Sequence, residues 1–336
     1  MGARSGERRA AARRGRGAQG WLGLVLGSVL AVSTAPAAER AQFVTLGTGG
    51  GPVIRVKRSE AANAVVVNGS VYLFDVGDGV QRQLAAAGLP LASVKAVFIS
   101  HHHMDHNGGL GPLMMSRWLL DPLPAIPVIG PPGTRAMTAG IAAANVATVN
   151  APVSLGPAPP PIEATVHAVD LPPVLDTPTE IYRDADVRVL AVSVAHFHLP
   201  AGMALDPEPR SYAFRIEAGG RTFVYSGDTG PSENLERLAM GADVLVSEVI
   251  DVAAAAASAG RTLPAAAVGP LVAHLRQDHL TPEDVGRIAA RAGVGEVVLT
   301  HLSPGLDTET DLTGYTRGIA PTFKGKVVVA ADLDRF

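Results

Sequence analysis

The sequence predicts an α/β protein in which β-sheets are covered by layers of helices. Short β-branched runs alternate with helical stretches at both ends of the chain, and this alternation is typical of layered folds. Of the 336 residues, 47% are apolar and 18% are charged, with 37 Gly and 26 Pro, a composition that favours a core-forming protein with many loops. No repeat and no second domain are evident, so we expect one domain over residues 38–336.

Strands are expected where β-branched residues gather between turn signals. In chain order these segments are residues 43–46, 64–67, 71–74, 96–100, 187–194, 212–216, 222–226, 244–248, 296–300 and 326–330. Helices are expected at residues 79–87, 110–119, 134–144, 232–240 and 282–292. The last of these has Thr281 as N-cap and Pro282 at its first position, both of which favour a helix start. The Pro-rich segments 156–161 and 171–178 are expected to be surface loops.

Residues 1–37 differ from the rest of the chain. Six arginines lie between Arg4 and Arg16, an apolar run covers residues 21–32, and small residues follow at 35–38. These are the three parts of a secretory signal peptide, and the apolar run is shorter than the roughly 20 residues of a membrane span. We therefore expect an exported, periplasmic or secreted protein with no stable membrane span after signal removal. The alternative is a basic tail before a buried helix.

Composition narrows the function classes. Without residues 1–37 the chain keeps 22 basic and 30 acidic residues, a net charge of −8, which lacks the basic surface of a general nucleic-acid binder. Nucleic acid is therefore not the expected partner. The chain has no cysteine, so a catalytic thiol is excluded.

The most informative motif is SHHHMDHNGG at residues 100–109, directly after an expected strand. In extended backbone, residues two apart point the same way, so His101 and His103 can hold one metal ion together. A turn after Met104 then lets Asp105 and His106 face a second ion. Imidazole and carboxylate are ligands that zinc accepts, at roughly 2.0–2.2 Å. The alternative is a histidine-rich surface loop without metal.

Three further candidate ligands each follow an expected strand. They are His196 in VAHFH, Asp228 in SGDTG and His301 in THLSP. Strand ends are held by a rigid sheet yet open into loops, which suits the construction of a site.

Taken in order, FDVGDG (74–79), SHHHMDH (100–106), VAHFH (194–198), SGDTG (226–230) and THLSP (300–304) resemble the five motifs of the metallo-β-lactamase superfamily. The resemblance implies a four-layer αβ/βα sandwich with a metal site at one edge of two mixed sheets. It places His101, His103 and His196 on one divalent ion and Asp105, His106 and His301 on a second, with Asp228 between them. Asp75 would support the site without being a ligand.

Further motifs point to one branch of that superfamily. DHLTP at residues 278–282 resembles the histidine motif of ribonuclease Z and its arylsulfatase-like relatives, in which the residue matching His279 helps protonate the leaving group. Glu248 matches an acidic position of the same group and could orient His279. The glycines of LGTGGGP (46–52) allow a tight turn near the site. Only 32 positions separate His196 from Asp228, which leaves no room for the tRNA-clasping arm of the RNA-processing members. The arylsulfatase-like branch is therefore the nearer resemblance.

The expected function is that of an exported dinuclear hydrolase, arylsulfatase-like or phosphodiesterase-like. A hydroxide bridging two ions would attack a sulfate or phosphate ester, with Asp105, Glu248 and His279 as the catalytic groups. Zinc is the expected metal, and Mn or Fe also suits His and Asp ligands. The expected partner is a small-molecule ester, and a homodimer is compatible with the resemblance. Three alternatives remain, namely a lactonase or β-lactamase, a ribonuclease Z-like phosphodiesterase, and a non-catalytic binding protein.

The other histidines are weaker candidates. His102 is expected to point away from the ligands, and His198 could line the pocket. His167 and His274 are expected on the surface or in packing.

Overall fold

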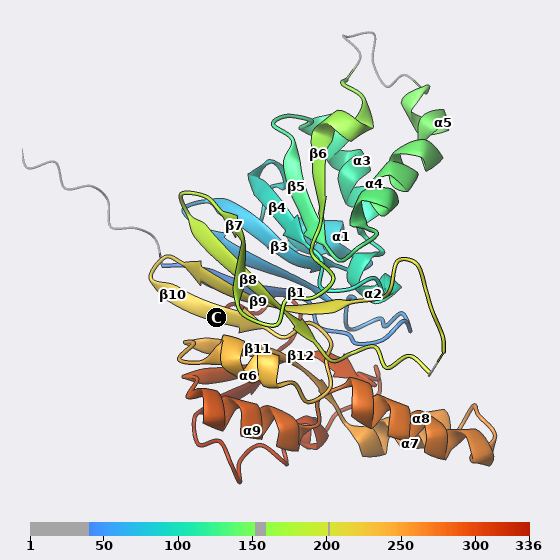
Figure 1. The fold of residues 1–336 in the computed structure, drawn as a ribbon, viewed down its shortest axis with the longest axis vertical. Coiled ribbons are helices and arrows are strands. Elements are labelled where there is room, and N and C mark those ends of the chain that lie inside the picture. The colour runs from blue at the N-terminus through green and yellow to red at the C-terminus, as the bar shows by residue number, and fades with distance from the viewer. Residues whose placement is uncertain (1–39, 152–158, 201) are drawn as a thin grey trace, which may run out of the picture. The chain divides into compact units, whose positions relative to one another are not determined.

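The computed structural model describes residues 40–151, 159–200 and 202–336 (Figure 1). The predicted signal peptide therefore lies outside the described residues, as does part of the Pro-rich segment 156–161. In the described part of the chain, no helix has the length and apolar character needed to cross a membrane.

Two mixed sheets form the centre of the fold over the described residues. The first has six strands in the order β1-β2-β3-β4-β5-β6, and the second has seven in the order β13-β12-β11-β10-β9-β8-β7. The strands of the first sheet are β1 Gln42–Gly47, β2 Ala62–Val67, β3 Ser70–Val76, β4 Val94–Phe98, β5 Ile126–Gly130 and β6 Val166–Asp170. Those of the second are β7 Thr179–Arg183, β8 Val187–Val194, β9 Ser211–Ala218, β10 Arg221–Tyr225, β11 Val244–Ile250, β12 Glu296–Ser303 and β13 Lys326–Val329.

Helices follow the strands along the whole described chain. They are α1 Val80–Ala86, α2 Met104–Asn107, α3 Leu110–Leu120, α4 Thr134–Ala144, α5 Val146–Val149, α6 Glu233–Ala239, α7 Val252–Ala259, α8 Ala265–Asp278 and α9 Pro282–Ala292. Short 3-10 turns occur at Leu91–Ser93, Ile162–Thr165 and Thr313–Tyr315. Helix α9 shows how the local sequence sets a helix, because Thr281 and Asp284 form a reciprocal capping box at its start and Gly293 ends it in the left-handed conformation.

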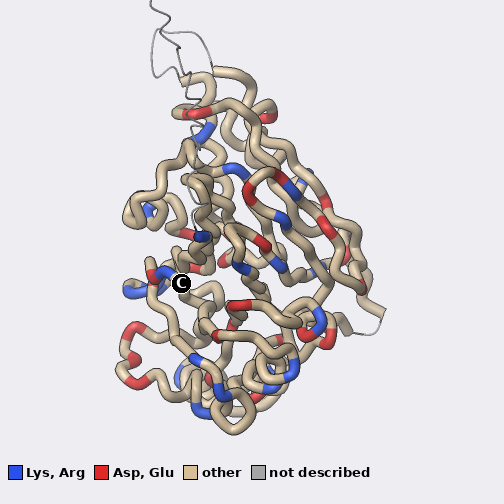
Figure 2. Tube along the Cα trace, turned by 90° about the vertical axis from the view of Figure 1, so that its left-hand side faces the viewer, with Lys and Arg blue, Asp and Glu red and all other residues tan. Residues whose placement is uncertain are grey.

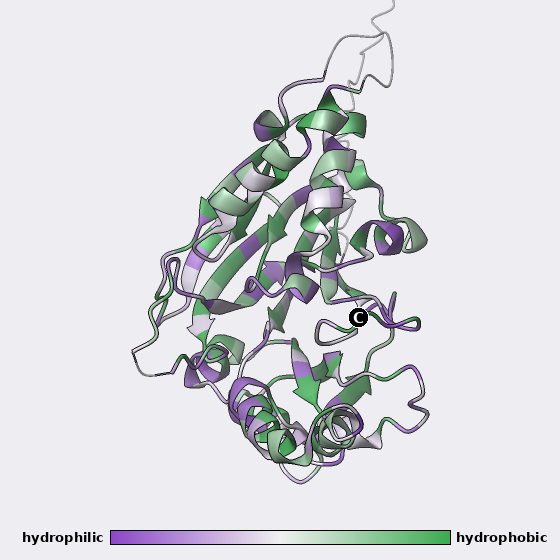
Figure 3. Cartoon of the chain, turned by 90° about the vertical axis from the view of Figure 1, so that its right-hand side faces the viewer, coloured by the Kyte–Doolittle hydropathy of each residue, from purple (hydrophilic) through white to green (hydrophobic). Residues whose placement is uncertain are grey.

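Three apolar clusters separate four layers. One lies between the sheets and contains the aromatic rings of Phe43, Tyr72, Phe74, Phe98 and Phe214. A second joins the outer face of the seven-stranded sheet to α6 and α9, and a third joins the outer face of the six-stranded sheet to α1, α3 and α4. Figure 3 shows the strands coloured chiefly as hydrophobic between these helices. The predicted four-layer α/β sandwich is confirmed.

The two sheets are also tied together through the first described strand. Phe43 in β1 exchanges both backbone hydrogen bonds with Phe336, at 3.1 and 2.9 Å. Just beyond β1, the amide of Leu302 in β12 donates to the carbonyl of Thr48 at 2.8 Å, and the amide of Gly50 donates to the carbonyl of Leu302 at 3.2 Å. The loop after β1 is thereby held against β12.

Several local expectations were incomplete or wrong. Strands β5, β6 and β7 and helices α2, α5, α7 and α8 are present but were not expected. Segment 171–178 has no regular structure, as predicted, but it is not wholly on the surface. Leu171 and Leu175 pack into the cluster between the sheets, so tertiary burial overrides the loop composition there.

Candidate metal centre

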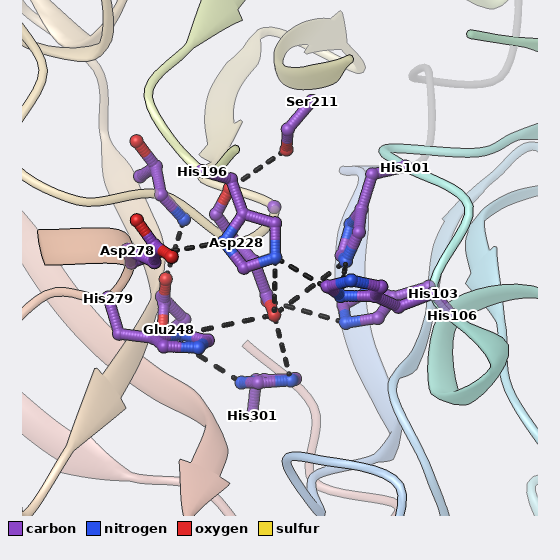
Figure 4. A network of polar contacts seen from close by, with 12 residues as sticks. His101, His103, His106, His196, Ser211, Asp228, Glu248, Asp278, His279 and His301 are labelled. Carbon is purple, nitrogen blue, oxygen red and sulfur yellow. Dashed lines mark hydrogen bonds and ion pairs between the residues drawn. The ribbon is translucent and has the colours of Figure 1, made fainter. Parts of the chain in front are cut away.

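The predicted ligands come together at the ends of four strands. His101 and His103 follow β4, His196 follows β8, Asp228 follows β10, and His301 lies near the end of β12. Figure 4 shows these side chains converging from both sheets on one small region. Asp105 and His106 reach the same region from the one-turn helix α2. All seven except His103 are buried.

His101, His103 and His196 form one trio of ring nitrogens. His101 Nε2 lies 3.0 Å from His103 Nδ1, which lies 3.2 Å from His196 Nε2. Zinc–nitrogen bonds of about 2.0–2.1 Å in a tetrahedron would separate neighbouring nitrogens by roughly 3.3 Å, so this spacing fits a shared ion. The other ring nitrogen of His196 lies 2.9 Å from the carbonyl oxygen of Asp278. Because a carbonyl only accepts, His196 Nδ1 carries the proton and Nε2 keeps a lone pair facing the trio.

Asp105, His106 and His301 form a second trio. Asp105 Oδ2 lies 3.3 Å from His301 Nε2 and 3.6 Å from His106 Nε2. His106 Nδ1 donates to Asp75 Oδ2 at 2.7 Å, which leaves the Nε2 lone pair facing the other two residues.

Asp228 lies between the two trios. Its Oδ1 is 3.3 Å from His106 Nε2, and its Oδ2 is 3.2 Å from His301 Nε2. The same Oδ2 is 3.9 Å from Nε2 of both His101 and His196. One carboxylate thus faces ligand atoms of both groups, and Ser211 holds its backbone by donating to the Asp228 carbonyl at 2.8 Å.

The residues fit divalent cations. Two buried atoms that face the second trio, His106 Nε2 and Asp228 Oδ1, have no hydrogen-bond partner, although buried polar atoms are ordinarily paired. Groups of His and Asp ligand atoms able to hold an ion recur across the site, including His101 with His103 and His196, and Asp105 with His106 and His301. A positive ion facing these lone pairs would satisfy atoms that the protein leaves unpaired.

The electrostatics of the site favour bound cations. Burial alone would raise the pKa of Asp228, but His301 and His106 hold it well below its usual value. Burial acts against ionisation of Asp105 as well, yet His106 and His301 lower its pKa. Burial lowers the pKa of His196 to about 4, so this ring is neutral at pH 7. Despite burial, the carboxylates of Asp228 and Asp105 raise the pKa of His106 and His301, so negative charge gathers there that a divalent cation would balance in place of protons on the two rings. Ionised carboxylates and neutral imidazoles are the forms that coordinate metals.

Asp75 orients the ring of His106 and is itself held by hydrogen bonds from neighbouring residues. Its carboxylate accepts hydrogen bonds from the Ser100 amide and hydroxyl, both at 2.7 Å, and from the Tyr225 hydroxyl at 2.8 Å. Asp75 and His301 have φ angles of 60° and 44°, a left-handed conformation that is costly for residues other than glycine. Such backbone strain persists where surrounding contacts fix it, and here it aims two site residues.

A histidine–carboxylate pair stands beside this cluster. His279 Nδ1 lies 2.7 Å from Glu248 Oε2, and Glu248 Oε1 accepts from the Thr229 amide at 2.6 Å. Burial would lower the pKa of His279, but the Glu248 carboxylate outweighs it and raises the value to about 9. His279 Nδ1 is 4.0 Å from Asp228 Oδ2. The structure therefore places Glu248 against His279, and both next to the seven predicted ligands.

The remaining histidines lie outside the cluster. His102 points to Thr134 and Asn107, as expected, and His167 is exposed on β6. His198, a weaker candidate for lining the pocket, contacts the carboxylate of Asp278 and is not among the cleft-lining residues. The same carboxylate pairs with His274 at 2.8 Å. Asp278 and Tyr225 were not singled out from the sequence. Asp278 could have been considered because it directly precedes His279 in DHLTP. The hydrogen bond from Tyr225 to Asp75 could not have been predicted, because it depends on how the strands pack.

A cleft of about 460 Å³ opens onto the centre. The Gly51 amide donates to Asp105 Oδ2 at 3.0 Å at its edge. A Cβ at Gly50 would lie 2.8 Å from His301 Nδ1, so the glycine-rich turn allows the backbone to approach the ligands closely.

Comparisons with known proteins agree with this geometry. Residues 71–302 match the family described as the β-lactamase superfamily domain. Ribonuclease Z of Mycolicibacterium paratuberculosis is 32% identical over 310 residues, which cover 88% of this chain and 97% of that protein. The metallo-β-lactamase fold protein YhfI of Bacillus subtilis has a TM-score of 0.61 at 19% identity, covering 88% of this chain and 98% of that one. The short form of human tRNase Z has a TM-score of 0.59 at 21% identity, with the same coverage. These two likenesses concern the fold.

Proposed function

Because the chain belongs to the metallo-β-lactamase superfamily, in the branch that contains ribonuclease Z, we propose that it hydrolyses a phosphate or sulfate ester at a site for two divalent ions. The observation that carries the proposal is the position of the His279–Glu248 pair beside seven converging His and Asp side chains. Membership of this superfamily confirms the resemblance found in the sequence motifs and identifies the chain as a hydrolase.

The chemistry divides between the ions and the protein. Divalent ions supply a water of lowered pKa and a positive charge near the oxygen on which negative charge develops. His101, His103 and His196 would hold one ion, Asp105, His106 and His301 the other, and Asp228 would contact both. Asp75 fixes the ring of His106 by accepting from its Nδ1. We take zinc as the metal, since the ligands are imidazoles and carboxylates alone, and Mn or Fe would also suit them.

His279 would deliver a proton to the leaving-group oxygen. Glu248 accepts from Nδ1, so Nε2 is the nitrogen left to face a substrate in the cleft that His279 lines. A positioned general acid of this kind contributes about 10²–10⁴-fold to turnover. The DHLTP motif that contains His279 resembles that of ribonuclease Z and its relatives, which is why we favour phosphate and sulfate esters over a lactone or a β-lactam.

RNA is the second candidate substrate. The acidic composition disfavours it, and Figure 2 shows acidic and basic residues interspersed on the side that it displays. The similarity to ribonuclease Z over nearly the full length of that protein favours it. We rank the small-molecule ester first and propose that the protein acts after export, on the strength of the signal-peptide pattern in residues 1–37.

One panel tests these proposals. Metal-replete protein is assayed against p-nitrophenyl sulfate, bis(p-nitrophenyl) phosphate, a lactone, nitrocefin and a precursor tRNA, with elemental analysis of the same sample. We expect about two ions per chain and turnover of a sulfate or phosphate ester, lost on chelation and restored by metal. Turnover restricted to nitrocefin or the lactone would contradict the proposal, and cleavage of the tRNA alone would replace it with the second candidate.

Export is tested separately. The full chain is expressed with a C-terminal tag, and the mature N-terminus is sequenced from the periplasm or medium. A start near residue 38 is expected, and an unprocessed chain confined to the cell interior would contradict export.

A further inference from the structure

The cleft at the metal centre has two chemically different walls. One carries the His and Asp ligands. The other is formed by helices α7 and α8, residues 252–278, which we call the α7–α8 hairpin, and it presents Ala255, Ala259, Leu271 and Leu275 to the cleft. The α7–α8 hairpin thus contributes four apolar side chains and the hydroxyl of Ser258 to the cleft, whereas His and Asp side chains of the metal centre line another part of it.

The α7–α8 hairpin contributes little to the core. Ala255 is the buried residue of α7, and Asp278 is the buried residue of α8. Leu271 and Leu275 are half-buried, so part of each side chain stays open to the cleft. Apolar side chains that line a cavity without packing in the core are typical of ligand pockets. Val53 and Met104 also line the cleft and are 55% and 58% exposed, so they add to its apolar surface.

One guanidinium stands at the rim of this cleft. Arg55 donates from one terminal nitrogen to the carbonyl of Pro304 at 2.8 Å, while its buried Nε has no hydrogen-bond partner. No ion pair within 4.0 Å involves Arg55 among the described residues, although the exposed Asp307 lies in a neighbouring loop. Since Arg55 spends one terminal nitrogen on a backbone carbonyl and makes no short ion pair among the described residues, its guanidinium keeps a positive charge and donor capacity for an anionic group beside the metal site.

The lining is a poor fit for RNA. Among its described residues, Arg55 is the one Lys or Arg side chain, and there is no Phe, Tyr or Trp. Single-stranded nucleic acids are bound by basic tracks and by aromatic rings on which bases stack. The volume of about 460 Å³ lies within the roughly 300–1,000 Å³ of small-molecule sites.

We infer that the α7–α8 hairpin is the substrate-selecting wall of the cleft, and that the substrate is an anionic ester with a compact alkyl or aryl group. That group would lie on Leu271 and Leu275 while Arg55 pairs with the charge. The inference rests on the proposed hydrolysis of phosphate or sulfate esters and narrows it to amphiphilic members of that class.

The test uses ligands that cannot be hydrolysed. Binding of p-alkylbenzenesulfonates with methyl, ethyl, propyl and butyl chains is measured by calorimetry on the metal-loaded enzyme. Affinity should rise about two- to fourfold with each methylene, the gain expected for burying one such group. Leu271→Ser and Leu275→Ser should flatten this dependence, whereas Leu271→Met should keep it. Leu120→Ser is the matched control, since Leu120 is 73% exposed on α3, away from the cleft lining.

The variant Arg55→Gln distinguishes the contribution of the Arg55 charge to sulfonate affinity from the contribution of the apolar wall. It should weaken every sulfonate by about tenfold without changing the dependence on chain length. Neutral N,N-dimethylsulfonamides of the same chains, which have no N–H to ionise at a metal, should bind Arg55→Gln and the unchanged enzyme equally.

The inference would be overturned if sulfonate affinity did not depend on chain length. It would also be overturned if Leu271→Ser and Leu275→Ser showed the same dependence on chain length as Leu120→Ser. The inference would also be overturned if a precursor tRNA bound tightly and displaced the sulfonates, and if Leu271→Ser and Leu275→Ser left that tRNA affinity unchanged. Because binding is measured without turnover, sulfonate binding by an enzyme inactive on all esters would instead count against the proposed function. Ester hydrolysis without such binding would count against this inference alone.

Discussion

The two sides of the cleft are built in opposite ways. Five of the seven ligands lie at or just beyond the ends of central strands, where neighbouring strands fix the backbone in register, and Asp105 and His106 lie on α2. His101, His106, Asp228 and His301 are at most 2% exposed. The α7–α8 hairpin has little burial and leaves its apolar residues partly open. Coordination chemistry needs ligand positions held to fractions of an ångström, which a sheet edge between two packed layers supplies. Substrate selection tolerates a loosely packed element, and such elements can change sequence at little cost to the fold.

The largest effect is expected from Asp228→Ala, which removes the carboxylate between the two trios. Loss of both ions would cost several kcal/mol of transition-state stabilisation, or roughly a 10³–10⁵-fold fall in kcat/KM. Metal content, measured by elemental analysis, should fall with it. Asp176→Ala, on an exposed loop, is the control. Retained activity with full metal content would refute the role of Asp228.

His279→Ala should lower turnover by about 10²–10⁴-fold for an ester with a poor leaving group such as phenolate, with metal content unchanged. The loss should shrink for p-nitrophenolate, which leaves without a proton. The readout is kcat across a series of leaving groups, with His167→Ala as the exposed control. A collapse of metal content would show instead that His279 acts as a ligand.

Asp75→Asn should weaken metal binding by about 10–100-fold, the usual cost of losing a partner that orients a ligand. The affected ring is that of His106, whose Nδ1 donates to Asp75. Competition with a chelator measures the affinity. Tyr225→Phe removes one of the hydrogen bonds to Asp75 and should have a smaller effect in the same direction. Equal metal affinity in Asp75→Asn and the unchanged enzyme would contradict this support.

The smallest effect is expected from Leu271→Ala in α8. It should change the free energy of unfolding by no more than about 0.5–1 kcal/mol, because the side chain packs little in the core. Leu299→Ala in β12 removes a fully buried side chain and should cost about 2–5 kcal/mol. Denaturant titration of both variants measures the difference. Equal losses would mean that the α7–α8 hairpin is as much a part of the core as the sheet.

Much of the sheet edge could be predicted from sequence because its signals are local. The strand that ends at Val194 and the helix from Pro282 to Ala292 begin and end where their patterns predict. Five of the seven expected ligands lie at or just beyond the end of a strand, and Asp105 and His106 lie on the short helix α2 that follows β4. The structure brings all seven together, and their roles as ligands remain predictions.

What could not be predicted depends on distant contacts or on conflicting local signals. Strand β5 contains Pro127, which argues against a strand, and β7 is a polar edge strand of five residues. Helix α8 runs through Pro270, which ordinarily breaks a helix. The burial of Leu171 and Leu175 arises from the opposite sheet and leaves no periodic pattern in the sequence.

The pairing of Phe43 with Phe336 has a consequence for the protein's biosynthesis. The loop after β1, which carries Gly50 and Gly51, is held by β12 and by the last described residues, and His301 itself lies on β12. A nascent chain that has not yet emerged as far as residue 301 lacks one ligand and the partner strand of that loop. Metal uptake is therefore expected to be a step of late maturation, and for an exported chain the cations would be drawn from the compartment in which it finishes folding. A variant truncated before Glu296 that retained both ions with full affinity would contradict this order of events.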